Sequence, residues 1–191
     1  MAVAFDAATS AQELTGDGVI SLSHTATGSE LAAFAGSGSF NTGFAGAMTY
    51  AGSAMTELWD QVFAISALYF QAGYALAGIA SGASTLTNTL TSAPDRHCCG
   101  VVTMTGVDQT TPAGTPVITD LDGTSISVTV GSVGTDDLVC DSAWTRQNST
   151  EGAVGRSMDL MPQTPLKICG EVLIRIHHHL MRFTFTDAII G

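Results

Sequence analysis

The stretch GVISLSHTATG, residues 18–28, alternates two kinds of side chain along its length. Every second residue from Ile20 to Ala26 is apolar or a histidine, and the residues between them are serines and a threonine. Side chains on a β-strand point alternately to the two faces of a sheet, so this spacing predicts a strand with one buried face and one wet face.

The same period of two recurs elsewhere and is separated by turn signals. It is found in TLTNTLTSA (85–93), TSISVTVGSV (124–133) and DDLVCDSAWT (136–145), with Gly-rich turns such as TGDG (15–18) and LDGT (121–124) between such runs. Many short strands joined by closely spaced turns are typical of sandwiches and barrels. We therefore predict an all-β fold: a single antiparallel β-sandwich domain of the jelly-roll type over residues 1–191, with at most one short helix.

The stretch GVVTMTGVDQTTPAGTP, residues 100–116, combines a strand with a loop. The alternation predicts that Val102 and Met104 face the core, whereas Thr103 and Thr105 face outward. The strand should end at Gly106, and the two prolines that follow cannot donate ladder hydrogen bonds. We expect a rigid crossing loop there, a place where sandwiches often make contacts. The best helix candidate is ELWDQVFAISALYF (57–70), although its aromatic and β-branched residues suit a strand equally well.

Composition narrows the classes of function. Charged residues make up 12% of the chain and hydrophobic residues 45%, and the charged share is about half the usual ~25%. This favours either a surface shared with neighbouring subunits or a plain β-domain coated with Ser and Thr. The formal net charge is −11, and no Lys or Arg precedes Arg96. Direct binding of DNA or RNA needs clustered basic residues, so it is not expected.

One segment raises the question of a membrane. No charge occurs between Asp60 and Asp95, and VFAISALYFQAGYALAGIASGAS (62–84) is long enough to cross a bilayer. Gln71, several glycines and the lack of flanking basic residues argue against a spanning helix. Two buried strands joined by a glycine-rich connection are the preferred interpretation. The start, MAVAFDAATS, has no basic region and is not expected to be a signal peptide.

Two groups of residues are candidate metal ligands. His177 and His179 could share an ion on one strand face, but no ligand at a suitable spacing completes the site, and an imidazole-rich strand is the plainer interpretation. Asp120, Asp122, Asp136 and Asp137 could attract calcium, yet they lack the remaining positions of a calcium loop, and Asp-Gly is simply a good turn. The expectation is no bound metal and no cofactor.

No enzyme motif is apparent. There is no G-x-S-x-G and no phosphate-binding loop, and His97 and Cys99 share a strand face without forming a catalytic pair.

The four cysteines, Cys98, Cys99, Cys140 and Cys169, contain no C-x-x-C pair and should be reduced and mostly buried. The aromatics Trp59, Trp144, Tyr50, Tyr69 and Tyr74 could form a sugar platform but more often belong to a core. Asn148-Ser149-Thr150 matches a glycosylation sequon, which has no meaning without secretion. We therefore expect no catalytic residue and a protein that is not an enzyme.

The order of several motifs resembles a known family. AFDAATS, LSHTATGSE, MTYAGSAMTELWD and VVTMTGVDQTTPAGTP are similar to segments of small β-sandwich proteins encoded by bacteriophages and by bacterial genomes that carry phage-like genes. The pattern falls on Ser23–Gly28, Met48–Thr56 and Thr105–Pro112 and covers about residues 3–145. The segment SMDLMPQTPLKICGEVLIRIHHHLMRF (157–183) departs from that family.

The resemblance implies a structural virion component located in the virion and assembled in the host cytoplasm. The favoured role is a capsid decoration or cement protein, a homo-oligomer (a trimer favoured) that contacts the major capsid protein or other virion proteins and no nucleic acid or membrane. The alternative is a carbohydrate- or receptor-binding sandwich on a tail fibre or cell surface, and a small hydrolase comes third.

Overall fold

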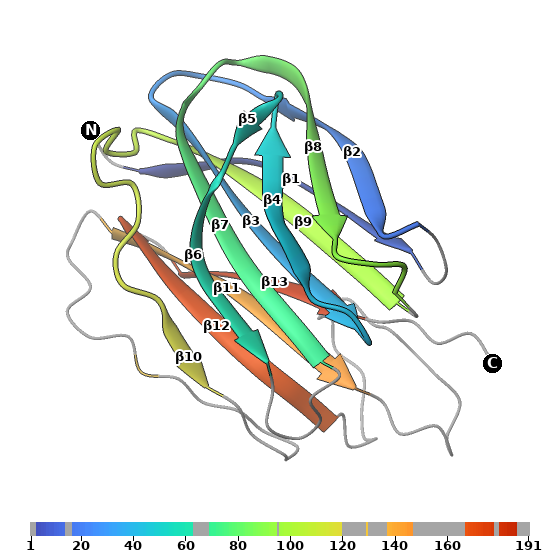
Figure 1. Ribbon diagram of the computed structural model, residues 1–191. Helices are drawn as coiled ribbons and strands as arrows, with labels where there is room; N and C mark the ends of the chain where they lie inside the picture. Colours follow the sequence, from blue (N-terminus) through green and yellow to red (C-terminus); the bar gives the residue numbers. More distant parts are fainter. Residues whose placement is uncertain are drawn as a thin grey trace, which may run out of the picture.

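The fold, seen in a computed structural model, is built from β-strands (Figure 1). The structure describes residues 3–13, 17–62, 69–94, 96–119, 129, 137–146, 167–177 and 180–186. Within these ranges no residue is helical. The prediction of an all-β fold is confirmed.

The central sheet, sheet A, has five antiparallel strands. Their order is β1-β9-β3-β7-β6, and their bounds are β1 (Ala4–Glu13), β9 (Arg96–Thr105), β3 (Leu31–Phe40), β7 (Tyr69–Ile79) and β6 (Thr56–Val62). The helix candidate 57–70 begins in β6 and ends in β7, and its residues 63–68 lie outside the described ranges. Its β-branched and aromatic residues therefore serve strands where they are described.

Sheet B covers one face of sheet A. Its order is β2-β8-β4-β5, with β2 (Val19–Ala26), β8 (Gly82–Leu90), β4 (Phe44–Tyr50) and β5 (Ser53–Ala54). Strands β2 and β8, which contain the two alternating stretches, pair antiparallel with Leu22 opposite Leu86. The alternation of β2 is strict: each residue from Ile20 to Ala26 at even positions is buried, and each at odd positions is exposed.

Sheet C has the order β10-β12-β11-β13. Its strands are β10 (Val117–Thr119), β12 (Lys167–His177), β11 (Asp137–Arg146) and β13 (Leu180–Thr186). Strands β10 and β11 run antiparallel to β12, whereas β13 runs parallel to β11. The predicted strand 124–133 lies outside the described residues except for residue 129.

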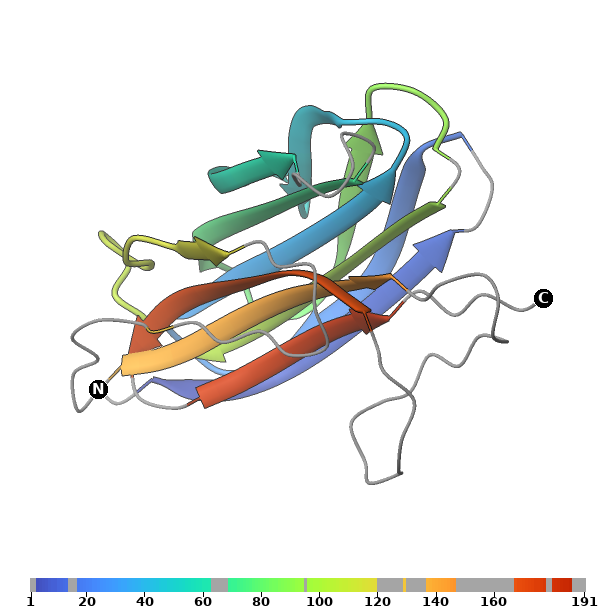
Figure 2. The same cartoon turned by 90° about the horizontal axis from the view of Figure 1, so that it is seen from below.

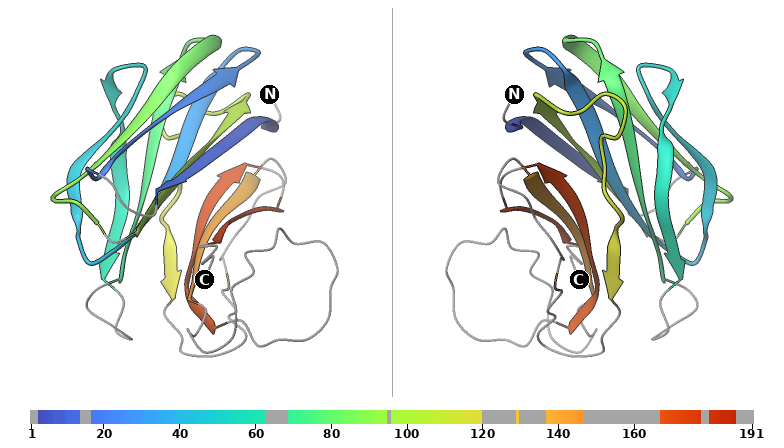
Figure 3. Two further views of the ribbon diagram at one scale, coloured as in Figure 1. Left: turned by 90° about the vertical axis from the view of Figure 1, so that its right-hand side faces the viewer. Right: turned by 90° about the vertical axis from the view of Figure 1, so that its left-hand side faces the viewer.

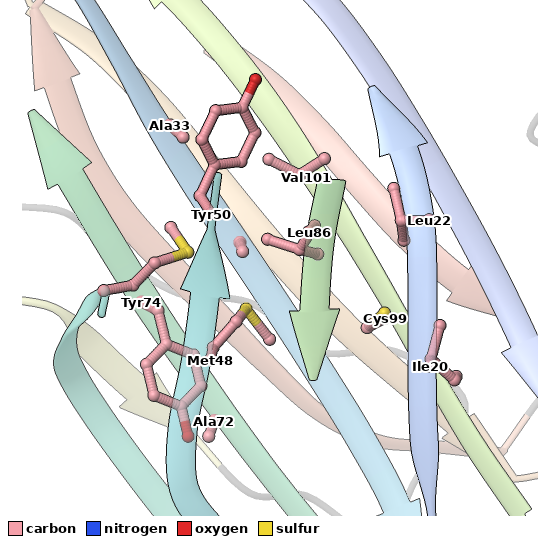
Figure 4. Close-up of a cluster of buried hydrophobic side chains, with 12 residues drawn as sticks. Ile20, Leu22, Ala33, Met48, Tyr50, Ala72, Tyr74, Leu86, Cys99 and Val101 are labelled. Atoms are coloured by element: carbon pink, nitrogen blue, oxygen red, sulfur yellow. The ribbon is translucent and has the colours of Figure 1, made fainter. Parts of the chain in front are cut away.

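The three sheets are stacked with sheet A in the middle (Figures 2 and 3). The core between sheets A and B includes Leu22, Met48, Tyr50, Tyr74, Leu86, Cys99 and Val101 (Figure 4). The core on the other face of sheet A includes Val3, Phe34, Trp59, Val102, Met104, Leu138 and Cys140. Leu138 and Cys140 belong to β11, so sheet C is held to sheet A by apolar contact.

A middle sheet is buried on both faces, and this corrects one prediction. Val102 and Met104 are buried as expected, but Thr103 is also fully buried, with 0% of its surface exposed. Thr103 faces sheet B while its neighbours face sheet C. The prediction that Thr103 points outward is wrong, because a third layer covers the face that a two-layer sandwich would leave wet.

The uncharged segment 62–84 contains the whole of β7 and the start of β8, joined by Ala80 and Ser81. The preference for strands is confirmed over its described part. Among the residues that the structure describes, no helix has the length and apolar character needed to cross a membrane.

Candidate functional site

A chain of hydrogen bonds crosses from sheet A to sheet B through His24. Thr9 Oγ1 lies 2.8 Å from His24 Nδ1, and His24 Nε2 lies 3.0 Å from Thr103 Oγ1. The Thr103 hydroxyl donates to Asp6 Oδ2 at 2.7 Å. His24 is 1% exposed, so this chain lies inside the protein up to the partly exposed carboxylate of Asp6.

The direction of each bond in this chain follows from Asp6. An ionised carboxylate can only accept hydrogen bonds, so the Thr103 hydroxyl donates its hydrogen to Asp6. The Thr103 oxygen then accepts a hydrogen bond from His24 Nε2–H. The neutral ring then has a bare Nδ1, which accepts from the Thr9 hydroxyl. His24 is thereby fixed as the Nε2–H tautomer.

The charge states of Asp6 and His24 agree with this assignment. Burial alone would raise the pKa of Asp6. The hydrogen bonds from Thr27 and Thr103 lower that pKa by a larger amount, so the pKa of Asp6 is below the usual value. Thr27 donates to Asp6 through both its backbone N–H and its hydroxyl. Burial lowers the pKa of His24, and the nearby Asp6 offsets only part of that effect. At neutral pH the hydrogen-bonded series through His24 therefore contains one carboxylate, Asp6, and one neutral imidazole, His24.

A second polar cluster lies between the same two sheets, around His97. Asn88 Nδ2 lies 2.9 Å from His97 Nε2 and also donates to Ser37 Oγ. Ser37 Oγ lies 3.3 Å from His97 Nε2 and donates to the Cys98 carbonyl at 3.2 Å. Asn88 and His97 are each 1% exposed, and burial lowers the pKa of His97 to about 4.

The imidazole rings of both clusters are buried, and this limits their chemistry. His24 and His97 are neutral bases inside a β-layered core, and each is 1% exposed. His97 and Cys99 do lie on one face of β9, as predicted, but burial raises the pKa of the Cys99 thiol to about 12. A thiol held protonated is not a nucleophile.

The other candidates are placed as follows. Cys98, Cys99 and Cys140 are buried thiols, as predicted, whereas nothing is described for the side chain of Cys169. Trp59, Tyr50 and Tyr74 are buried in the cores rather than arranged as a sugar platform, and the side chains of Tyr69 and Trp144 lie outside the described part.

The candidate metal ligands are mostly outside the described residues. This applies to Asp120, Asp122, Asp136, His178 and His179. Asp137 and His177 are Cα partners in the β11–β12 pairing. Over the described residues, no group of three His, Cys, Asp or Glu side chains could hold a metal ion.

The C-terminal strands bring ionisable residues to neighbouring register positions. Strand β11 pairs Val139 with Arg175 of β12 and Asp141 with Arg182 of β13. The two arginines thus flank β11 on opposite sides, two register positions apart.

Comparison with known proteins identifies this same C-terminal region. The sequence model of the prephenate dehydratase family matches residues 145–188. A bifunctional chorismate mutase/prephenate dehydratase of Neisseria gonorrhoeae is 61% identical over 36 residues, which are 19% of this chain and 10% of that protein. The enzyme of the same name from Pseudomonas aeruginosa is 54% identical over 45 residues, 22% of this chain and 12% of that protein. No solved structure matches the chain.

The chain therefore spans about a tenth of the length of the curated relatives it matches. The match includes β12, β13 and the last two residues of β11, Thr145 and Arg146. It begins where the resemblance to phage sandwich proteins ends.

This finding overturns the functional expectations drawn from that resemblance. Assignment to a phage virion family, as a capsid decoration or cement protein or as a tail-fibre or receptor-binding module, is wrong, because the matched relatives are metabolic enzymes of bacteria. The expected virion location and the expected partners, the major capsid protein or other virion proteins in a trimer, are contradicted on the same ground. The expectation that the protein is not an enzyme is contradicted as well, since the curated relatives that match the C-terminal region are enzymes.

Sequence reasoning missed this region for an identifiable reason. The histidines His177–His179 suggest either metal ligands or an imidazole-rich strand, and Asn148–Thr150 suggests a glycosylation sequon, so neither motif points to this family. The useful signal was the departure of residues 157–183 from the pattern of the preceding chain.

Proposed function

We propose that residues 145–188 form a prephenate-binding segment of the dehydratase type, carried on the layered β-sheet body through β11. The similarity of this segment to bifunctional chorismate mutase/prephenate dehydratases, 61% over 36 residues in one case, is the observation on which the proposal rests. The proposal concerns binding by this segment and not a complete dehydratase, since the match spans about a tenth of each relative.

The distribution of charge supports binding of an anion in this segment. Five of the six basic residues of the chain lie in it, namely Arg146, Arg156, Lys167, Arg175 and Arg182. With four acidic residues the segment has a formal charge of +1, whereas the remainder, with one basic and thirteen acidic residues, has −12. Prephenate is a dicarboxylate. The remainder of the chain is strongly acidic and disfavours a dianion, whereas the segment 145–188 has a small positive charge.

In this proposal, two of these basic residues bind the carboxylates of prephenate. Arg175 and Arg182 flank β11 on strands β12 and β13. A guanidinium can bind a carboxylate through two parallel hydrogen bonds, and a dicarboxylate offers one carboxylate to each arginine.

Calorimetric titration of the full chain with prephenate tests the proposal. We expect binding that weakens at least tenfold in the double variant Arg175→Gln/Arg182→Gln and is unchanged in Arg96→Gln, which lies on β9 outside the matched segment. Circular dichroism of each variant should show that the sheets are intact. A folded chain that gives no binding heat, or equal affinity in all three proteins, would refute the proposal.

A further inference from the structure

The polar cluster around His97 leaves hydrogen-bonding groups unused inside the protein. Among the described residues, Asn88 Oδ1 and His97 Nδ1 are buried atoms that have no hydrogen-bond partner. Their side chains come from strands β8 and β9, on the facing sheets B and A. Nearly all buried polar groups in native proteins are paired with protein atoms or with ordered water, so two such atoms in one cluster point to an unassigned ligand.

The known bonds determine which group is a donor and which an acceptor. The Ser37 hydroxyl donates to the Cys98 carbonyl, and Asn88 Nδ2 donates to Ser37 Oγ and to His97 Nε2. Nε2 must then carry a lone pair, so the proton of the neutral ring is on Nδ1. The unused groups are one donor, His97 Nδ1–H, and one acceptor, Asn88 Oδ1.

A third unused atom lies on the neighbouring strand. Glu13 is the Cα partner of His97 in the β1–β9 pairing, so both residues lie on the face of sheet A that meets sheet B. Glu13 Oε2 is also buried and has no hydrogen-bond partner among the described residues. Three strands thus contribute two unused acceptors and one unused donor at this end of the layer between sheets A and B.

This combination selects the class of ligand. A bare cation is disfavoured by the Nδ1–H donor, and an anion is disfavoured by the two oxygen acceptors. A water molecule donates two hydrogen bonds and accepts others, which complements all three groups. The unused atoms of Asn88 and His97 belong to side chains already in contact at 2.9 Å, so one or two water molecules can connect them.

We propose that Glu13, Asn88 and His97 form an internal water site at this end of the layer between sheets A and B. The conclusion holds for either orientation of the Asn88 amide. If the amide were turned, its oxygen would accept from His97 Nε2–H, and the unused pair would be an Asn88 N–H donor and a bare Nδ1 acceptor. That pair again requires a ligand that both donates and accepts.

His24 provides an internal control for the experiment. Both of its ring nitrogens have partners within the protein, Thr9 and Thr103, so its site needs no water. With the Asn88 amide oriented as described, His97 should be the Nδ1–H tautomer and His24 the Nε2–H tautomer. Long-range proton–nitrogen NMR spectra of the full chain distinguish the two forms.

Water itself is detected by nuclear Overhauser transfer from solvent to the ring protons of each histidine, and by a crystal structure at about 1.5 Å or better. We expect transfer to His97 and none to His24, with electron density for water within hydrogen-bond distance of Asn88 and His97. The proposal would be overturned by a dry site, by an ion in the density, or by a protein side chain that satisfies Nδ1 and Oδ1. Loss of prephenate binding would leave this result unaffected, because the water site rests on separate residues.

Discussion

Trp59 of β6 lies directly over Gly73 of β7, its Cα partner in sheet A. A Cβ atom built on Gly73 would be 2.1 Å from Trp59 Nε1 and 2.5 Å from Trp59 Cε2, far closer than atoms can approach. Gly73 is therefore required by the indole, which fills the core between sheets A and C.

Gly73→Ala should force the indole out of its position and lower the free energy of unfolding by about 1–3 kcal/mol. The matched control is Gly43→Ala, where the new Cβ would lie 3.6 Å from the Phe70 ring, an ordinary contact. Its effect should stay within about 0.5 kcal/mol. Urea unfolding of the two variants measures the difference, and equal stabilities would show that the Trp59–Gly73 packing is not as described.

Thr103→Val tests the hydrogen-bonded chain through His24. Valine has the shape of threonine but cannot donate to Asp6 or accept from His24, so a buried imidazole N–H loses its partner. We expect a loss of about 1–3 kcal/mol in the free energy of unfolding. Thr105→Val, on the same strand and half-buried, lies outside this chain and should change stability by less than about 0.5 kcal/mol.

Stability should depend on pH through His97. Its pKa falls from 6.5 to about 4 on folding because the ring is buried. Between these values the unfolded chain binds the proton and the folded chain does not, so stability is complete above pH 6.5 and declines as the pH falls toward 4. The full decline is about 3 kcal/mol, and the lowered pKa of His24 acts in the same direction.

Urea midpoints at pH 7.5, 6.0 and 4.5 measure this dependence, with the pH kept high enough for Asp6 to remain ionised. The variant His97→Gln should remove the His97 contribution to this decline and leave that of His24. An NMR titration in which His97 gains its proton near pH 6.5 in the folded protein would contradict the prediction.

Cys99 should be almost inert in the folded protein. It has 0% of its surface exposed, and burial raises the pKa of its thiol from 9.0 to about 12. Since the thiolate is the reactive form, ionisation alone should slow alkylation about a thousandfold near neutral pH. A short pulse of iodoacetamide followed by peptide mass spectrometry should leave Cys99 unlabelled, while the urea-unfolded chain is labelled there. Rapid labelling of the native protein would mean that sheets A and B do not enclose this residue.

The period of two was informative where a strand has one wet face. In β2 and β8 the predicted burial of Leu22 and Leu86 is confirmed, because the exposed residues beside them carry the polar half of the pattern. The same rule failed at Thr103, because β9 is buried on both faces and its hydroxyl is satisfied by hydrogen bonds inside the protein. A threonine in a sequence does not reveal whether its partner is water or a buried histidine.

The polar cluster of Ser37, Asn88 and His97 could not be predicted from the sequence. Its members come from three strands on two sheets, and only the folded register brings Ser37 and Asn88, 51 residues apart, into contact. The C-terminal region is different, because its distinguishing feature, a concentration of basic residues, lies within one continuous stretch of sequence. Residues 145–188 carry most of the positive charge of an acidic chain, a contrast that the charge distribution before Arg96 already suggested.

Amide hydrogen–deuterium exchange of the full chain, with and without prephenate, tests the central claim most directly. We predict slower exchange with prephenate in peptides from residues 145–188, and no change in peptides from β2 and β8. Exchange that is unaltered throughout, or protection confined to sheets A and B, would contradict the assignment of prephenate binding to this segment.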